Sequence, residues 1–198
     1  MKANQHAPRI LGGQYRGRVI QVPPGRGTRP LRALARRSLF DKLSPLLPGA
    51  RVLDLFAGAG TVGLEAASRG AALVVLVEQG RPALEALRRS IHIFGAGPRV
   101  QVVAADVLHY LAGAALERFE LIFLGPPYRL YQDRADNDLE RVLDRVGALL
   151  APDGTLVLEH PSNFQAPPVA GLTLVESRTY GDTALGFFNR QQNQKAQA

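Results

Sequence analysis

From Arg51 onward, short and almost entirely apolar segments alternate with longer segments of helical periodicity. The apolar segments span residues 51–56, 72–78, 99–105, 119–125 and 155–160, and the helix-like stretches between them end near residue 68 and then span 81–94, 107–116 and 138–150. Strands that are apolar nearly throughout are buried on both faces, and strands separated by helices pair in parallel. The pattern therefore predicts an α/β fold with a mostly parallel sheet covered by helices on both faces.

Segments at both ends of the chain complete this predicted fold. Residues 172–181 and 183–188 indicate a closing antiparallel pair, which brings the predicted sheet to seven strands. Residues 9–23 predict a β-hairpin around a Gly-Gly turn, and residues 31–43 predict a basic helix with a buried stripe of Leu34, Leu39, Phe40 and Leu43. We expect an N-terminal extension over 1–45, a main domain over 46–190 and a disordered tail over 191–198.

Positive charge is concentrated in the N-terminal fifth of the chain. The net charge is +7, and residues 1–42 alone hold ten basic side chains and a single acid, Asp41. Arginine, whose planar fork suits phosphate and stacked bases, outnumbers lysine throughout the chain. Such asymmetry predicts a polyanionic partner for the N-terminal segment, nucleic acid above all.

Composition excludes several other classes of protein. The chain has no cysteine, so neither disulfides nor thiolate metal sites can form, and we expect no metal. The first residues lack the apolar core of a signal peptide, and no apolar run approaches the length of a membrane span. We therefore expect a cytoplasmic protein without a membrane partner, and nothing in the sequence demands more than a monomer.

A glycine-rich loop follows the first strand of the predicted sheet. Its Gly58, Gly60 and Gly63 match the spacing of a dinucleotide-binding loop, at which a nucleotide-like ligand meets a helix N-terminus. Asp54 precedes the first glycine by four residues, and a carboxylate there would face any pyrophosphate. That position suits a ligand with an ammonium group and no phosphate, such as S-adenosylmethionine, while an NAD-dependent oxidoreductase remains the alternative.

Acidic residues also follow the second and third strands, at the same edge of the predicted sheet. Glu78 ends an apolar strand, where a carboxylate can accept hydrogen bonds from both hydroxyls of a ribose. Asp106 is placed either to accept from an adenine amino group or to cap the helix that follows. Ligands of open α/β sheets bind outside the carboxyl ends of the strands, so these acids are candidate binding residues.

The fourth strand ends in Gly125-Pro126-Pro127-Tyr128. The two prolines fix the chain and remove amide donors, which leaves carbonyl groups free to accept hydrogen bonds. The tyrosine beside them offers a face on which a base taken out of its helix can stack. Residues 125–128, which we name the catalytic segment, are therefore either a site for such a base or a rigid turn that ends the strand.

At these places the chain resembles class I methyltransferases, and more narrowly the RsmD family, which methylates a guanine exocyclic amine in small-subunit rRNA. The resemblance covers nearly the whole chain and is carried by RILGGQYRGR, TRPLRALARRSLFDKL, LDLFAGAGTVGLEAASRGA, VLVE, PPY, LEH and YGDTALGFF. It implies a Rossmann-like methyltransferase fold and transfer of a methyl group from S-adenosylmethionine to the N2 amine of a guanine in 16S rRNA, or in the assembling small ribosomal subunit.

The resemblance also assigns roles to residues. It implies that the cofactor is bound by Asp54, Ala57, Gly58, Gly60, Thr61, Glu78, Gln79, Asp106 and Val107, and that Gly125, Pro126, Pro127 and Tyr128 hold the target guanine. The hairpin and basic helix would contact RNA, mostly at phosphates, and our candidates are Arg16, Arg18, Arg29, Arg32 and Arg36.

The chain departs from the family's pattern at its catalytic segment. The family's Asp or Asn before the two prolines orients the target amine, and this chain has Gly125 instead. Smaller departures are Leu31 and Ala33 for Thr and Asp, Gln79 for Asp, and Ser90 for Asn. Two interpretations remain: an active enzyme whose backbone carbonyls at Gly125 and Pro126 orient the amine, because methyl transfer depends mainly on alignment, or an RNA-binding protein that keeps the fold without turnover.

Overall fold

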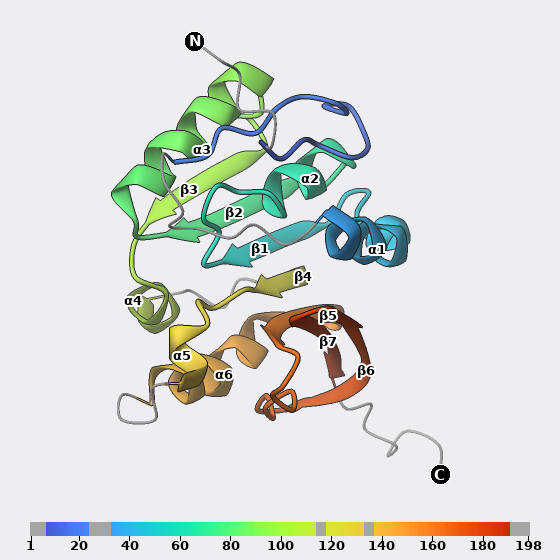
Figure 1. Cartoon of the computed structure of the whole chain (residues 1–198), viewed down its shortest axis with the longest axis vertical. Coiled ribbons are helices and arrows are strands. Elements are labelled where there is room, and N and C mark those ends of the chain that lie inside the picture. The colour runs from blue at the N-terminus through green and yellow to red at the C-terminus, as the bar shows by residue number, and fades with distance from the viewer. Residues whose placement is uncertain (1–6, 24–32, 114–117, 133–136, 191–198) are drawn as a thin grey trace.

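The computed structural model describes residues 7–23, 33–113, 118–132 and 137–190. Within them a seven-stranded sheet has the order β3-β2-β1-β4-β5-β7-β6 (Figure 1). The first five strands pair in parallel, and β7 pairs antiparallel with both β5 and β6. The strands are β1 (Arg51–Leu55), β2 (Leu73–Glu78), β3 (Val100–Ala104), β4 (Phe119–Leu124), β5 (Leu150–Pro161), β6 (Leu172–Tyr180) and β7 (Thr183–Arg190).

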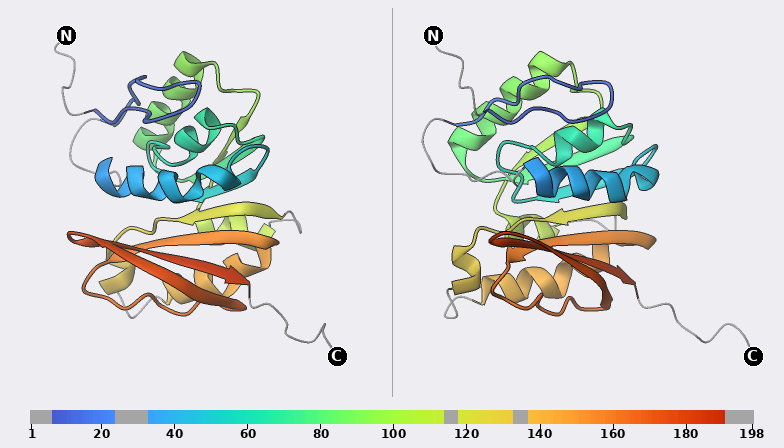
Figure 2. Two further views of the ribbon diagram at one scale, coloured as in Figure 1. Left: turned by 90° about the vertical axis from the view of Figure 1, so that its right-hand side faces the viewer. Right: turned by 45° about the vertical axis from the view of Figure 1, so that its right-hand side comes forward.

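Helices cover both faces of this sheet, as the alternating pattern predicts. They are α1 (Ala33–Leu43), α2 (Gly63–Ser68), α3 (Arg81–Phe94), α4 (Val107–Gly113), α5 (Arg129–Gln132) and α6 (Asp138–Val146), with short 3₁₀ turns at Ser44–Leu46 and Gly147–Leu149. One apolar cluster packs α1, α2 and α3 against the sheet, and a second packs α4 and α6 against the opposite face. Figure 2 shows α1 lying across the sheet on one side.

Strict alternation along the strands decides which side chains face which helices. On β1, Val52 belongs to the cluster under α1, α2 and α3, whereas Leu53 and Leu55 belong to the other. Asp54 therefore points to the same face as Val52, since successive side chains alternate across a sheet. The register pairs Asp54 with Phe123 of β4, which brings these two side chains together on that face.

The N-terminal segment forms a closed loop in place of a regular hairpin. Its only described strand pairing is an antiparallel bridge between Arg9 and Val19. Polar side chains of α2 and α3 accept four of its N–H groups: Glu65 accepts those of Leu11 and Gly12, Ser68 Oγ that of Tyr15 and Ser90 Oγ that of Gln21. Backbone groups that bond to helix side chains cannot also form a ladder, so the predicted hairpin is reduced to a bridge.

Helix α1 is present, but the prediction of its buried stripe is wrong at one position. Leu34 is 71% exposed, whereas the buried residues are Ala35, Arg36, Leu39, Phe40 and Leu43. The physical reason is spacing, because side chains share a helix face at intervals of three or four residues, and Leu34 lies five residues from Leu39. Residues 24–32, which include Arg29 and Arg32, and the predicted tail over 191–198 lie outside the described residues.

Burial of Arg36 corrects one predicted RNA contact. Its side chain is 2% exposed, and its Nη2 donates to the carbonyl of Arg9 at 2.6 Å. Desolvation by burial lowers the pKa of Arg36, and the nearby charge of Glu65 partly opposes that shift. Arg36 therefore fastens the N-terminal loop to α1 from the inside and is not available to a phosphate, whereas Arg16 and Arg18 are exposed.

Candidate active site

A cavity of about 540 Å³ opens at the carboxyl ends of the central strands. In Figure 1 the arrowheads of β1 and β4 point to the side on which α4 and α5 lie. Loops after β1, β2, β3 and β4 and the ends of β5 and β7 line the cavity. Its volume falls within the range typical of small-molecule sites, and its place at the strand ends is where open α/β sheets bind ligands.

The glycine-rich loop wraps around the buried carboxylate of Asp54. Asp54 is 2% exposed, and its Oδ2 accepts the N–H of Gly63 at 2.9 Å. Gly60 turns the loop with φ of +75°, and a Cβ built there would lie 2.4 Å from Leu87 Cδ1, so a larger residue does not fit. The loop is thereby held tightly over the end of β1, with Asp54 at the base of the cavity.

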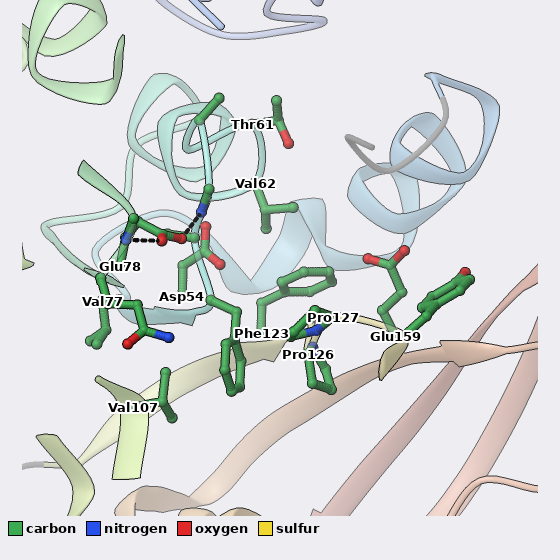
Figure 3. Close-up of a pocket in the computed structure, with 18 of the residues that line it drawn as sticks. Asp54, Thr61, Val62, Val77, Glu78, Val107, Phe123, Pro126, Pro127 and Glu159 are labelled. Atoms are coloured by element: carbon green, nitrogen blue, oxygen red, sulfur yellow. Dashed lines mark hydrogen bonds between the residues drawn. The ribbon is translucent and has the colours of Figure 1, made fainter. Parts of the chain in front are cut away.

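Glu78 ties the same loop to the end of β2. Its Oε2 accepts the N–H of Gly58 at 2.8 Å, and its Oε1 accepts that of Gly80 at 2.6 Å. Figure 3 shows Asp54 and Glu78 on one side of the cavity and Pro126, Pro127 and Glu159 on the other. Two carboxylates thus line one wall of the cavity, and the proline-rich segment forms the opposite wall.

Burial raises the pKa of two carboxylates at the cavity, Asp54 and Glu159. Desolvation raises the pKa of Asp54 to about 7, the Gly63 N–H opposes this, and the charges of Glu78 and Glu159 raise it further. Desolvation likewise raises the pKa of Glu159 to about 7. A buried acid surrounded by other acids is stabilised by a cation, so this wall favours a positively charged ligand.

The catalytic segment forms the wall nearest β4, and all four of its residues line the cavity. Gly125 is fixed by its N–H, which donates to the carbonyl of Leu55 at 3.3 Å. The hydroxyls of Tyr128 and Thr183 are 2.6 Å apart and share a hydrogen bond, which sets the orientation of the tyrosine ring. Residues 125–128 therefore form a wall of the cavity whose backbone is held at Gly125 and whose tyrosine hydroxyl is held by Thr183.

Most of the predicted cofactor residues lie at the cavity. Asp54, Ala57, Gly58, Thr61, Glu78, Gln79 and Val107 line it. Gly60 shapes the loop without lining the cavity. Asp106 is exposed and not among the lining residues, and its Oδ1 accepts the N–H groups of Leu108 and His109 at 2.8 and 3.2 Å. Of its two predicted roles, the structure therefore displays the helix cap.

Sequence reasoning missed several residues of this cavity. Phe123, Arg129, Glu159 and Thr183 line it, and none was predicted. Glu159 and Thr183 lie within LEH and YGDTAL, two stretches that carry the family resemblance. The sequence therefore marked both residues, but no role was predicted for either. The described residues contain no group of three or more His, Cys, Asp or Glu side chains placed to hold a metal ion. Nor does any described helix combine the length and apolar character needed to cross a membrane.

Comparisons with known proteins agree with this geometry. A family model described as "Conserved hypothetical protein 95" matches residues 8–189. YlbH of Bacillus subtilis (strain 168), which bears the name of an rRNA methyltransferase, is 31% identical over 186 residues, covering 92% of this chain and 99% of that protein. Ribosomal RNA small subunit methyltransferase D of Escherichia coli (strain K12) is 39% identical over 121 residues, covering 61% of this chain and 60% of that protein.

The solved structure of yhhF from Escherichia coli, described as a methyltransferase, superimposes with a TM-score of 0.80 at 30% identity, covering 93% of this chain and 98% of that one. Fold and site together define a class I methyltransferase that depends on S-adenosylmethionine. Within that class the chain belongs to the family described as "Conserved hypothetical protein 95", the RsmD family. This membership decides against the NAD-dependent oxidoreductase.

The residues present fit S-adenosylmethionine. Asp54 and Glu78 both line the cavity, where the carboxylate of Asp54 would bind its ammonium group and that of Glu78 its ribose hydroxyls. Buried Val77, Val107 and Phe123 add apolar surface for the rest of the molecule. When bound, this cofactor supplies a methyl group made electrophilic by a sulfonium sulfur.

Proposed function

We propose that this enzyme methylates the N2 amine of a guanine in 16S rRNA, within the assembling small ribosomal subunit. The observation that carries the proposal is the segment Gly125–Tyr128, whose four residues line the same cavity as the carboxylates of Asp54, Glu78 and Glu159 and whose Tyr128 hydroxyl is held by Thr183. The named activity of the Escherichia coli relative supports rRNA as the substrate. A cytoplasmic location follows from such a substrate, and a monomer suffices because one chain supplies every lining residue named here.

The residues of the catalytic segment and Phe123 would each make a different contact with a bound guanine. The ring of Tyr128 would stack on the extruded base, since base–aromatic stacking is worth about 1–3 kcal/mol. Carbonyl groups of Gly125 and Pro126 would accept hydrogen bonds from its polar edge, because prolines leave no competing amide donor. Apolar Phe123 and the prolines would exclude water from the reacting amine.

Exposed arginines of the N-terminal loop would hold the RNA backbone. Arg16 and Arg18 are both exposed. Arg18 also donates to the carbonyl of Ile93 at 3.1 Å and lies 5.5 Å from the centre of the Tyr15 ring, so its position is fixed. Arg29 and Arg32, which lie outside the described residues, remain part of the proposed contact set.

Methyl incorporation into ribosomal RNA tests the proposal. Purified protein and radiolabelled S-adenosylmethionine are incubated with small subunits, naked 16S rRNA and large subunits from a strain that lacks the family's enzyme. Label on one guanine of 16S rRNA, recovered as N2-methylguanine, is the expected result, with Asp54→Asn as the inactive control. Binding of both cofactor and RNA without any label would instead support the RNA-binding protein without turnover.

A further inference from the structure

The side chain that the family supplies at the start of the catalytic segment is missing here, and another acid occupies its place. A Cβ built on Gly125 would lie 3.5 Å from Glu159 Oε2 and 3.0 Å from Phe123 Cε1. The second distance is tighter than ordinary van der Waals contact, so Phe123 would have to shift to admit a side chain at position 125. A carboxylate oxygen from the neighbouring strand therefore already stands beside the empty position.

Strand register accounts for this placement. β4 and β5 pair in parallel, with Phe123 opposite Val157 and Leu124 opposite Leu158. Continuing that register sets Glu159 beside Gly125, and alternation points Glu159 to the same face as Val157 and Phe123. Figure 3 shows Glu159 on the same side of the cavity as Pro126 and Pro127.

The carboxylate of Glu159 differs from the structural carboxylates of this protein in having free acceptor capacity. Glu65 accepts three hydrogen bonds, from the N–H groups of Leu11 and Gly12 and from Arg69 Nε. Among the described residues, no group donates a hydrogen bond to the side chain of Glu159, and the Tyr131 hydroxyl donates at 2.7 Å to its main-chain oxygen instead. A half-buried carboxylate at a cavity wall, with no donor among the described residues, can accept a hydrogen bond from a ligand.

We propose that Glu159 is the acceptor for the target amine, in place of the side chain that Gly125 lacks; this inference rests on the proposed function. Glu159 Oε2 accepts a hydrogen bond from the guanine N2 amine and so directs the nitrogen lone pair at the methyl group. As nitrogen bonds to the methyl carbon, the carbon–sulfur bond breaks with its electron pair going to sulfur. One N2 proton passes to Glu159 and then to water.

The groups around Glu159 are consistent with this role. The charge of Glu159 acts on Asp54 and Tyr131, and the other titratable or charged side chains of the same cavity are Glu78, Tyr128 and Arg129. Desolvation, followed by the charge of Glu159, raises the pKa of Tyr131, so that neighbour stays neutral. The pKa of Glu159, about 7, lets the same group accept a hydrogen bond as a carboxylate and hold a proton briefly.

Single-turnover kinetics on the small subunit test the inference. Glu159→Ala is expected to lower the rate of methyl transfer roughly ten- to a hundredfold, while the Kd for S-adenosylmethionine and the KM for RNA stay within about twofold. Glu159→Gln, which is closest in shape, is expected to retain an intermediate rate, because its amide oxygen accepts but cannot take the proton. Glu140→Ala, which removes an exposed acid on α6, is the control, and its rate of methyl transfer is expected to equal that of the unaltered protein.

A rescue experiment separates an acceptor from a merely structural residue. Adding Gly125→Asp to Glu159→Ala is expected to raise the rate of methyl transfer about tenfold over that of Glu159→Ala. In the protein that keeps Glu159, Gly125→Asp is not expected to raise the rate, because the two carboxylates would repel each other. A Glu159→Ala rate within twofold of the unaltered rate overturns this inference but leaves the proposed function standing. The same holds if Glu159→Ala and Glu159→Gln both lose cofactor binding and Gly125→Asp does not restore the rate. An unaltered protein that methylates no rRNA overturns the proposed function as well.

Discussion

The buried carboxylate of Asp54 makes cofactor affinity depend on pH in a predictable direction. Burial raises the pKa of Asp54 to about 7, and neighbouring Glu78 and Glu159 add to the shift. The ammonium group of S-adenosylmethionine binds the ionised form of Asp54. In molecules whose Asp54 is protonated, binding must therefore release that proton. Because protonation competes with the cofactor, affinity is expected to rise as the pH rises through 7 and to fall below it.

The size of the effect follows from the fraction of Asp54 that is ionised. With a pKa of about 7, roughly half of the molecules are ionised at pH 7 and roughly 3% at pH 5.5. The Kd is therefore expected to weaken about fifteenfold between those pH values, which corresponds to on the order of 1–2 kcal/mol. The amino group of the cofactor titrates above this window, near the ordinary value for an α-amine, and stays cationic throughout.

Isothermal titration calorimetry of S-adenosylmethionine across this window provides the assay. Asp54→Asn is the matched variant, since the amide oxygen can still accept the Gly63 N–H while the charge is gone. Its affinity at pH 7 is expected to be about ten- to a hundredfold lower and nearly independent of pH. Equal affinity of the unaltered protein for S-adenosylmethionine at pH 5.5 and pH 7 would refute the reasoning. An affinity of Asp54→Asn that changed with pH as much as that of the unaltered protein would also refute it.

Three further predictions concern the loops around the cavity. Glu65→Ala is expected to lower the free energy of unfolding by about 3–5 kcal/mol, measured by urea denaturation, because it leaves the half-buried N–H groups of Leu11 and Gly12 and the guanidinium of Arg69 without their acceptor. Gly60→Ala, at a φ of +75° and against Leu87, is expected to cost about 1–3 kcal/mol in the same measurement and to weaken cofactor binding. Arg16→Ala is expected to reduce the salt dependence of RNA binding, the slope of log K against log salt, by about 1.

Each of these predictions has a control in the same chain. Glu85→Ala removes an exposed pair with Arg81 and should change stability by no more than about 0.5 kcal/mol. Gly97→Ala, where an added Cβ meets nothing within 4 Å, is the counterpart of Gly60→Ala. Arg141→Ala, on α6 of the opposite face, should leave the salt slope unchanged. Equal effects in a variant and its control would contradict the corresponding argument.

The sheet could be predicted because its determinants are local. Runs such as 72–78 and 119–125 are apolar enough to require burial on both faces, and the segments between them have a helical period. Asp54 and Glu78 were also within reach, because side chains that follow parallel strands meet at one edge. Local pattern thus predicted the parallel part of the sheet and one wall of the cavity, but not the order of the strands.

Contacts between segments far apart in the chain could not be predicted from the sequence. The N-terminal loop is built on Glu65, Ser68 and Ser90, whose role depends on how α2 and α3 pack. Burial of Arg36 depends on the same packing. Glu159 stands beside Gly125 only through the register of β4 with β5, and no periodicity links residues so far apart in the chain.

Nucleoside analysis of 16S rRNA from living cells tests the central claim most directly. A bacterial strain that lacks its own family member would express this protein, and its 16S rRNA would be digested and examined by mass spectrometry. The account predicts that one N2-methylguanosine, missing from the parent strain, returns with the unaltered protein and not with Asp54→Asn. Absence of that nucleoside, in cells whose purified protein binds both S-adenosylmethionine and small-subunit RNA, would contradict it.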